Sequence, residues 1–245
     1  GLVKTAWDRE GITRRVRKAY IKGNLKVGFE LSSTGAGIHE EGTDAPAEET
    51  LLLGIVEMVP KMLKKWVTVS DEVLALGSEE FLNYVYDEIT YKIVEYAADL
   101  VIAKIQAAPE TPTSSAVAVP AVEGPVDAGK IIDAIALLGD GARDLVFIAS
   151  GTTIATIKKA ALNASYQYDP FAGLTVIQKA GVDGAIVGDL AGVQANLPEG
   201  DAVRFKFDDL SLAEKDLVKI VGRLYAAIEV VGPGMLVNIT EESES

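Results

Sequence analysis

Few residues in this chain could do chemistry. It has no cysteine and a single histidine, His39, which lies between Ile38 and Glu40. Thiol nucleophiles, thiolate metal ligands and disulfides are therefore excluded, and a catalytic triad or metal site would have to gather every other group around that one imidazole. We expect His39 to be an ordinary surface residue, and the sequence predicts no catalytic residue and no metal site.

The glycine-rich stretches do not predict a nucleotide site either. Gly35, Gly37 and Gly42 lack the spacing of a dinucleotide-binding turn, and "GDGARD" lacks the Lys and the Ser or Thr of a phosphate-binding loop. "GVDGAIVGDLAG" has no acidic partner in a second βαβ unit, so we interpret it as a strand between flexible turns. No cofactor is expected, and an α/β enzyme is kept only as a remote alternative.

Charge is the other chemical feature, and it is unevenly placed. Residues 1–26 hold eight basic and two acidic residues, a net charge of +6, whereas the rest of the chain holds 15 basic and 34 acidic residues, a net charge of −19. Nucleic-acid binding by the basic arm is disfavoured, because so acidic a body repels a polyanion. The alternative is that the basic and the acidic segments are ordinary solvated surface, because runs of charge usually are.

The basic arm is followed directly by an acidic segment. Residues 27–50 contain no Lys or Arg and six acids, of which five lie near the tip: Glu40, Glu41, Asp44, Glu48 and Glu49. We expect this tip to be an intersubunit contact. We expect the arm to dock on an acidic surface of another copy through four residues: Arg14, Arg15, Arg17 and Lys18.

Two elements must position these charges. Apolar and polar residues alternate as in strands on both sides of the acidic tip within residues 22–58, which predicts a long hairpin. A two-stranded hairpin is only marginally stable alone. Residues 79–106 predict one helix with Ser78 as its N-cap, about 42 Å long at 1.5 Å per residue. No apolar run is long enough to span a bilayer, so no membrane partner is expected.

The helix pattern separates two faces. The spacing of three and four predicts an apolar face toward the core, made of Leu82, Val85, Ile89, Ile93, Tyr96, Leu100 and Ala103. The opposite face is acidic and consists of Glu80, Asp87, Glu88, Glu95 and Asp99.

Beyond the helix, residues 107–128 hold four prolines among small residues, which predicts a loop with little packing potential. Short helix-like and strand-like segments then alternate, which predicts a compact mixed unit. A Val- and Ile-rich β return closes the chain, with Gly222 and Gly232 expected at bends or bulges.

This order of segments resembles the major capsid proteins of tailed bacteriophages with the Hong-Kong-97-like fold. The resemblance rests on "EETLLLGIVEMVPKMLKKWVTVSDEVLALGSEEFLNYVYDEITYKIVEYAADLVIAK", similar to the family's β return into its spine helix, and on the closing "DLVKIVGRLYAAIEVVGPGMLVNI". The resemblance covers nearly the whole chain in order. It rests on the order of the segments more than on any single residue, because the motifs are loose. It implies an α+β capsid fold whose parts are an N-terminal arm at 1–24, an extended loop at 25–58, a peripheral domain at 59–112 and 199–228 with the spine helix at 79–106, and an axial domain at 113–198 and 229–245.

The resemblance also implies a function and partners. The function is a structural protein that assembles into the hexamers and pentamers of an icosahedral shell around double-stranded DNA, formed in the host cytoplasm and found in the virion. Partners would be other copies, a portal, a scaffold or prohead protease and, as an option, a decoration protein, with packaged DNA facing the acidic helix surface. Gly1 in place of Met is expected where a prohead protease removes an N-terminal scaffolding segment.

The sequence departs from the family in one respect. Some members join the extended loop to a neighbour by an isopeptide bond that needs a Lys in the loop, but residues 27–50 have none, and Gly222 and Arg223 occupy the stretch that aligns with the family's catalytic acid. We therefore expect noncovalent assembly. The alternative within the same fold is an encapsulin, a shell that encloses enzyme cargo.

Overall fold

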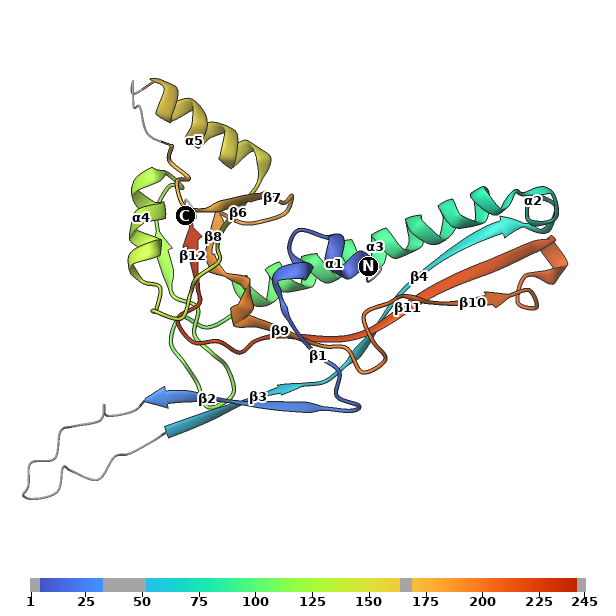
Figure 1. The fold of residues 1–245 in the computed structure, drawn as a ribbon, viewed down its shortest axis with the longest axis horizontal. Helices are drawn as coiled ribbons and strands as arrows, with labels where there is room; N and C mark the ends of the chain where they lie inside the picture. The colour runs from blue at the N-terminus through green and yellow to red at the C-terminus, as the bar shows by residue number, and fades with distance from the viewer. Residues whose placement is uncertain (1–4, 33–51, 164–168, 242–245) are drawn as a thin grey trace, which may run out of the picture. The chain divides into compact units, whose positions relative to one another are not determined.

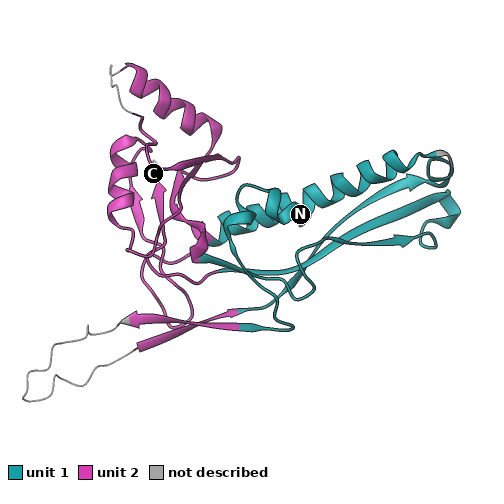
Figure 2. Cartoon of the chain, in the orientation of Figure 1, with its two compact units in different colours: residues 1–25, 58–104, 193–229 teal, residues 26–57, 105–192, 230–245 magenta. Residues whose placement is uncertain are grey.

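The computed structural model describes residues 5–32, 52–163 and 169–241. Helices and strands are mixed along the chain, as the predicted α+β class requires. The chain divides into two compact units (Figure 2). The first unit comprises residues 1–25, 58–104 and 193–229, and the second comprises 26–57, 105–192 and 230–245. Both units are therefore discontinuous in sequence.

The first unit is a long sheet packed on a long helix (Figure 1). Its strands are β1 (Arg17–Ala19), β4 (Lys61–Ser70), β9 (Val193–Asn196), β10 (Arg204–Asp208) and β11 (Leu217–Val230). Its helices are α1 (Ala6–Arg9), α2 (Asp71–Leu76) and α3 (Glu79–Gln106), with short 3-10 turns at Thr13–Arg15 and Ala213–Lys215. Strand β11 is shared, because β4 and β10 both pair with it antiparallel.

Helix α3 confirms the predicted helix over 79–106. Its start is capped as expected, because the Phe81 amide donates to Ser78 Oγ at 3.4 Å. Ile89 and Ile93 are buried against β11 at Gly222, where an added Cβ would lie 2.4 Å from Ile89 Cγ2. Gly222 therefore serves a close approach of helix and sheet. A bulge at Gly222 is excluded, since the pairing of β11 with β4 runs through this residue without interruption.

The predicted apolar face of α3 is partly wrong. Val85, Ile89 and Ile93 are buried, but Tyr96 is 53% exposed and Ala103 is also exposed. Leu82 and Leu100 are half-buried. The buried residues Val94, Ala97, Ala98, Val101 and Ile102 instead surround the C-terminal half of the helix. A single amphipathic stripe does not describe a helix that is covered from more than one side.

The arm supplies part of that second cover. Helix α1 lies beside α3 in Figure 1, and residues of the two line one hollow, among them Ala6, Arg9, Thr90 and Val94. Trp7 in this segment is fully buried. Strand β1 then pairs parallel with β9, so the described arm is built into its own unit.

A lysine and an asparagine secure the arm. Lys18 Nζ bonds Asp8 Oδ1 at 2.7 Å and Asp201 Oδ2 at 2.8 Å. Burial lowers the pKa of Lys18, but the hydrogen bonds to Asp201 and Asp8 outweigh burial, so the pKa stays above its ordinary value and the ammonium is charged. The buried Asn196 accepts from the Ile21 amide at 2.9 Å and donates to the Ile21 carbonyl at 3.0 Å.

The expected hairpin is confirmed in its described strands. Strand β2 (Leu25–Ser32) pairs only with β3 (Leu52–Met58) among the described residues, forming a two-stranded sheet. Phe29 and Val56 are buried, and the Phe29 ring lies over Gly54, where an added Cβ would be 2.4 Å from it. One face of the hairpin is thus packed.

The second unit holds a five-stranded sheet in the order β5-β12-β8-β6-β7. These strands are β5 (Ala121–Glu123), β6 (Leu145–Ala149), β7 (Thr175–Gln178), β8 (Ala185–Asp189) and β12 (Leu236–Thr240). The helices are α4 (Ala128–Ala136) and α5 (Gly151–Asn163), with a 3-10 turn at Leu190–Gly192. Phe147, Phe171, Ile131 and Val187 are buried in its core. "GVDGAIVGDLAG" contains β8, which confirms a strand between turns.

The Pro-rich segment packs more than expected. Val117 and Val119 are almost fully buried, and β5 pairs parallel with β12. The Ser114 carbonyl accepts from the Ile55 amide of β3 at 2.9 Å, so this segment also contacts the hairpin. Proline excludes helix here but leaves extended backbone free to pair, and that possibility was missed.

We predict that Gly222→Ala lowers the free energy of unfolding by about 1–3 kcal/mol, because the new methyl group must displace buried Ile89 and Ile93. Chemical denaturation of the unassembled chain measures the change. Gly11→Ala is the matched control, since a Cβ there meets nothing within 4 Å. Equal stability of both variants would contradict close packing at Gly222.

We predict that Lys18→Met loosens the arm, because it removes the cation between Asp8 and Asp201. Lys18 is partly exposed and solvent screens the pairs, so the loss of stability should be about 1 kcal/mol. Amide hydrogen exchange should rise in residues 17–19. The raised pKa means that the Lys18 contribution is complete at neutral pH and fades only above the ordinary lysine pKa. Lys22→Met, at an exposed position, is the control; equal exchange in both variants would refute the role of Lys18.

Candidate assembly interface

The described residues offer several exposed surfaces that could take part in assembly. No group of three or more potential metal ligands occurs within residues 5–32, 52–163 and 169–241. Among the same residues, no helix is both long and apolar enough to cross a membrane. His39 lies outside the described residues.

The exposed side of the hairpin carries apolar and charged side chains, because Leu53 and Ile55 share it with Glu57, and the exposed Lys26 and Glu30 alternate with the buried Phe29 on β2. On β3, Leu53 and Ile55 are 60% and 52% exposed, while the alternate residues Val56 and Met58 are buried. Leu52, at the start of the strand and on the face of Val56, is also exposed, at 54%. Apolar side chains on the open face of a two-stranded sheet are an interaction surface, because such a sheet has no third layer of its own. The predicted contacts Glu40, Glu41, Asp44, Glu48 and Glu49 lie between the two strands and outside the described residues.

The four arm residues predicted to dock on another copy divide into two kinds. Arg14 and Arg17 are exposed, as an outward contact requires. Arg15 is half-buried, and Lys18 is held by Asp8 and Asp201 of its own chain. The structure therefore leaves Arg14 and Arg17 as the accessible pair and assigns Lys18 a role in fixing the arm.

The acidic face of α3 is accessible along most of its length. Glu80, Asp87, Glu88 and Asp99 are exposed, and Glu95 is half-buried. Glu95 Oε2 accepts from Lys92 Nζ at 2.9 Å, and this hydrogen bond raises the pKa of Lys92. The face is thus acidic but interrupted by one cation.

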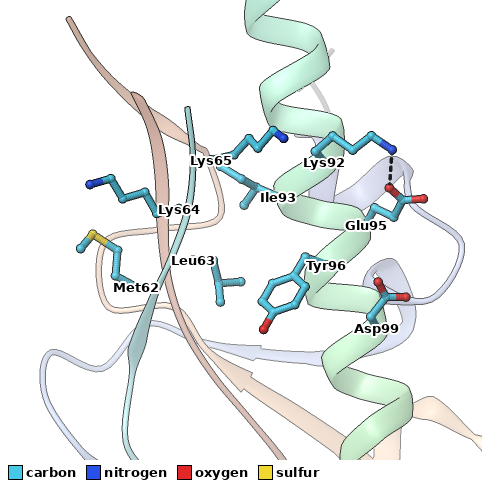
Figure 3. Close-up of a pocket in the computed structure, with 9 residues that line it drawn as sticks. All are labelled: Met62, Leu63, Lys64, Lys65, Lys92, Ile93, Glu95, Tyr96 and Asp99. Atoms are coloured by element: carbon cyan, nitrogen blue, oxygen red, sulfur yellow. Dashed lines mark hydrogen bonds and ion pairs between the residues drawn. The ribbon is translucent and has the colours of Figure 1, made fainter. Parts of the chain in front are cut away.

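Two hollows border this face. The larger one, of about 540 Å³, lies between β4 and α3 and is shown in Figure 3. Leu63, Ile93 and Tyr96 supply its apolar wall, and Glu95 and Asp99 lie on its helix side. The smaller one, of about 280 Å³, includes Asp87 beside the arm. Neither hollow gathers groups for catalysis.

Sequence reasoning missed one surface on the other side of the first sheet. Figure 3 shows Met62 and Lys64 pointing away from α3, while Leu63 and Lys65 point toward it. Trp66, two residues after Lys64, is 53% exposed. The two-residue period of a strand could have placed Lys64 and Trp66 of "KMLKKWVTV" on one side of the sheet, but not what lies beside them on other strands.

Comparison with known proteins places this architecture. The sequence matches the phage capsid family over residues 2–238. No curated protein matches it. Among solved structures, the capsid of an empty GTA particle superposes with a TM-score of 0.76 at 15% identity, covering 99% of this chain and 92% of the other.

Two phage structures are also similar. That of Mycobacterium phage Bobi has a TM-score of 0.66 at 15% identity, covering 100% of this chain and 93% of the other. That of Microbacterium phage Oxtober96 has a TM-score of 0.66 at 12% identity, covering 99% and 94%. These likenesses confirm the expected fold, and with the match along nearly the whole sequence they identify the chain as a member of the phage capsid family.

Proposed function

We propose that this protein is a major capsid protein that assembles into the hexamers and pentamers of an icosahedral shell around double-stranded DNA. The observation that carries the proposal is the hairpin, whose strand β3 exposes Leu53 and Ile55 on its open face. Membership of the phage capsid family supports the same function. An encapsulin shell and an α/β enzyme are not favoured, because the matching family is one of phage capsids.

Apolar burial gives the physical reason for assembly. Burying apolar surface between two subunits stabilises their contact by roughly 25 cal/mol per Å². Each large exposed side chain that a neighbour covers therefore contributes about 1 kcal/mol or more to the free energy of assembly. A shell repeats that contact in every subunit, and weak contacts add when they are repeated. The open hairpin face is therefore a cost to the isolated chain and a driving force for the assembled one.

Further partners follow from the proposed function. A portal, a scaffold or prohead protease and, as an option, a decoration protein would act with the shell, which would assemble in the host cytoplasm and persist in the virion. Arg14 and Arg17 are proposed to contact an acidic surface of a neighbouring copy, because both are exposed on an arm of net positive charge. No membrane or catalytic step is part of the proposal.

We predict that the purified chain forms closed shells visible by negative-stain electron microscopy. Because residues 27–50 contain no lysine, boiled particles should run as one band near the chain mass of 25.9 kDa on a denaturing gel. A monodisperse monomer under all assembly conditions would contradict the capsid function. A ladder of covalent multimers would contradict only the noncovalent mode of assembly.

The acidic face of α3 is proposed to line the shell interior. Packaged DNA would then meet carboxylates, and like charges within a Debye length of about 8 Å at physiological salt would keep the DNA from adhering. Glu80 and Glu88 are exposed, so their carboxylates are available to repel the DNA. The alternative is that the carboxylates only keep an exposed helix face solvated.

We predict that shells carrying Glu80→Lys and Glu88→Lys still form but retain DNA fragments that wild-type shells release. Binding of short duplex DNA to disassembled and reassembled shells, measured against salt, tests this. Glu110→Lys with Glu214→Lys gives the same change of charge at other exposed positions and is the control. Equal DNA retention by both double variants would remove the proposed role of the helix face.

A further inference from the structure

The side of the first unit's sheet that faces away from α3 is basic, which is unexpected in so acidic a chain. Cross-strand partners share a face, so the strand registers place side chains of β4, β11 and β10 in rows. The three rows are Lys64, Arg223 and Arg204; Trp66, Val221 and Lys206; and Thr68, Lys219 and Asp208. The rows therefore hold five cations and one carboxylate.

The direction of these side chains follows from their neighbours. Gly222 faces buried residues of α3, so the residues before and after it on β11 point the other way. Lys64 points away from α3 in Figure 3. Phe205 packs on Tyr86 of α3, so the next residue, Lys206, points outward. The basic face is defined here as Trp66 with the four cations around it: Lys64, Lys206, Lys219 and Arg223.

Trp66 is the centre of the basic face. Lys64 Nζ and Lys219 Nζ each lie 5.7 Å from the centroid of its ring, while 53% of the side chain is exposed. Arg204 is left out of the basic face, because it pairs with Glu199 at 3.4 Å. The carboxylate of the third row, Asp208, is hydrogen-bonded to Ser211. The face thus offers an open aromatic ring with cations beside it.

Protection of sheet edges explains only part of this charge. Lysines on edge strands commonly prevent pairing with other chains, and β4 and β10 are edge strands among the described residues. That role accounts for Lys64 and Lys206. It does not account for Lys219 and Arg223, because β11 is paired on both sides at these positions. Cations in the middle of a sheet around an exposed Trp indicate a ligand that is both anionic and flat.

Single-stranded nucleic acid has this chemistry. Each nucleotide brings one phosphate charge and one base with an open face, and open sheets bind such strands by stacking bases on aromatic rings while cations hold the phosphates. A duplex keeps its bases paired and offers phosphates alone. An acidic peptide offers carboxylates without a flat ring for each charge.

The acidic remainder of the chain does not exclude a polyanion from this face. The exposed carboxylates Glu80 and Glu88 belong to α3, on the opposite side of the sheet. The sheet and much of a helix about 10 Å across separate them from the basic face, which exceeds the Debye length of about 8 Å at physiological salt. The net charge therefore slows the approach of a polyanion, whereas the local cations decide whether it stays bound.

We propose that the basic face binds single-stranded nucleic acid without sequence preference. One base stacks on Trp66, and neighbouring phosphates pair with the four cations of the face. The site is a property of the single chain, so the inference does not rest on the proposed capsid function.

Titration of the full, unassembled chain with a short oligothymidylate tests the proposal. The chain has two tryptophans and Trp7 is fully buried, so quenching of tryptophan emission follows Trp66. An oligomer of equal length with the same phosphates but no bases should bind about tenfold more weakly and quench little. Binding of oligothymidylate should weaken as salt is raised, because its phosphates release counterions to the cations of the face.

Variants separate the two parts of the site. Lys64→Gln with Lys219→Gln should weaken binding about tenfold and lower the slope of log affinity against log salt by about 1.4, since each phosphate contact of a single strand contributes about 0.7. Trp66→Leu keeps the cations and should lose the preference for the oligomer with bases. Lys158→Gln with Lys159→Gln, at exposed positions of α5, is the matched control and should bind as the wild type does.

Four results would each overturn the proposal. These are equal binding of the oligomers with and without bases, tighter binding of a duplex of the same length, unchanged binding by the double variant of Lys64 and Lys219, and binding of polyglutamate as tight as that of oligothymidylate. The last result would assign the basic face to an acidic protein segment. The capsid function is tested separately by electron microscopy and does not depend on any of these results.

Discussion

The hairpin of β2 and β3 imposes the constraint on which the rest of this account depends. Two strands have two faces, and among the described residues one of them is packed, through Phe29 and Val56, while the Ile55 amide bonds the Ser114 carbonyl at the edge of β3. The other face keeps Leu53 and Ile55 in water. Because exposed apolar side chains of this kind are costly in isolation, a neighbouring copy that covers them would stabilise the assembled state.

The first unit is held together by contacts between its helix, its sheet and the arm. Helix α3 is held against the sheet by close contact at Gly222, and its other side is partly covered by the arm. Lys18 and Asn196 fix the arm to β9 and to Asp201. The arm is therefore part of its own unit, and of the predicted set only Arg14 and Arg17 are exposed.

Local patterns predicted single elements well. The bounds of α3 followed from Ser78 and the absence of Pro or Gly, and β8 from its turns, because these signals are local. Burial depends on what else packs nearby, so Tyr96 was misplaced and the buried Val117 was missed. The side of the sheet that carries Lys64, Lys206 and Lys219 was missed because strand pairing brings Lys64 beside lysines more than a hundred residues later in the sequence.

Hydrogen exchange of the hairpin amides in assembled and unassembled protein tests the central claim most directly. A neighbour that covers the open face should slow exchange in residues 25–32 and 52–58 by orders of magnitude in shells, while the amides of the sheet in the second unit change little. Equal exchange of the hairpin amides in shells and in free subunits would show that no neighbour covers it and would contradict the account.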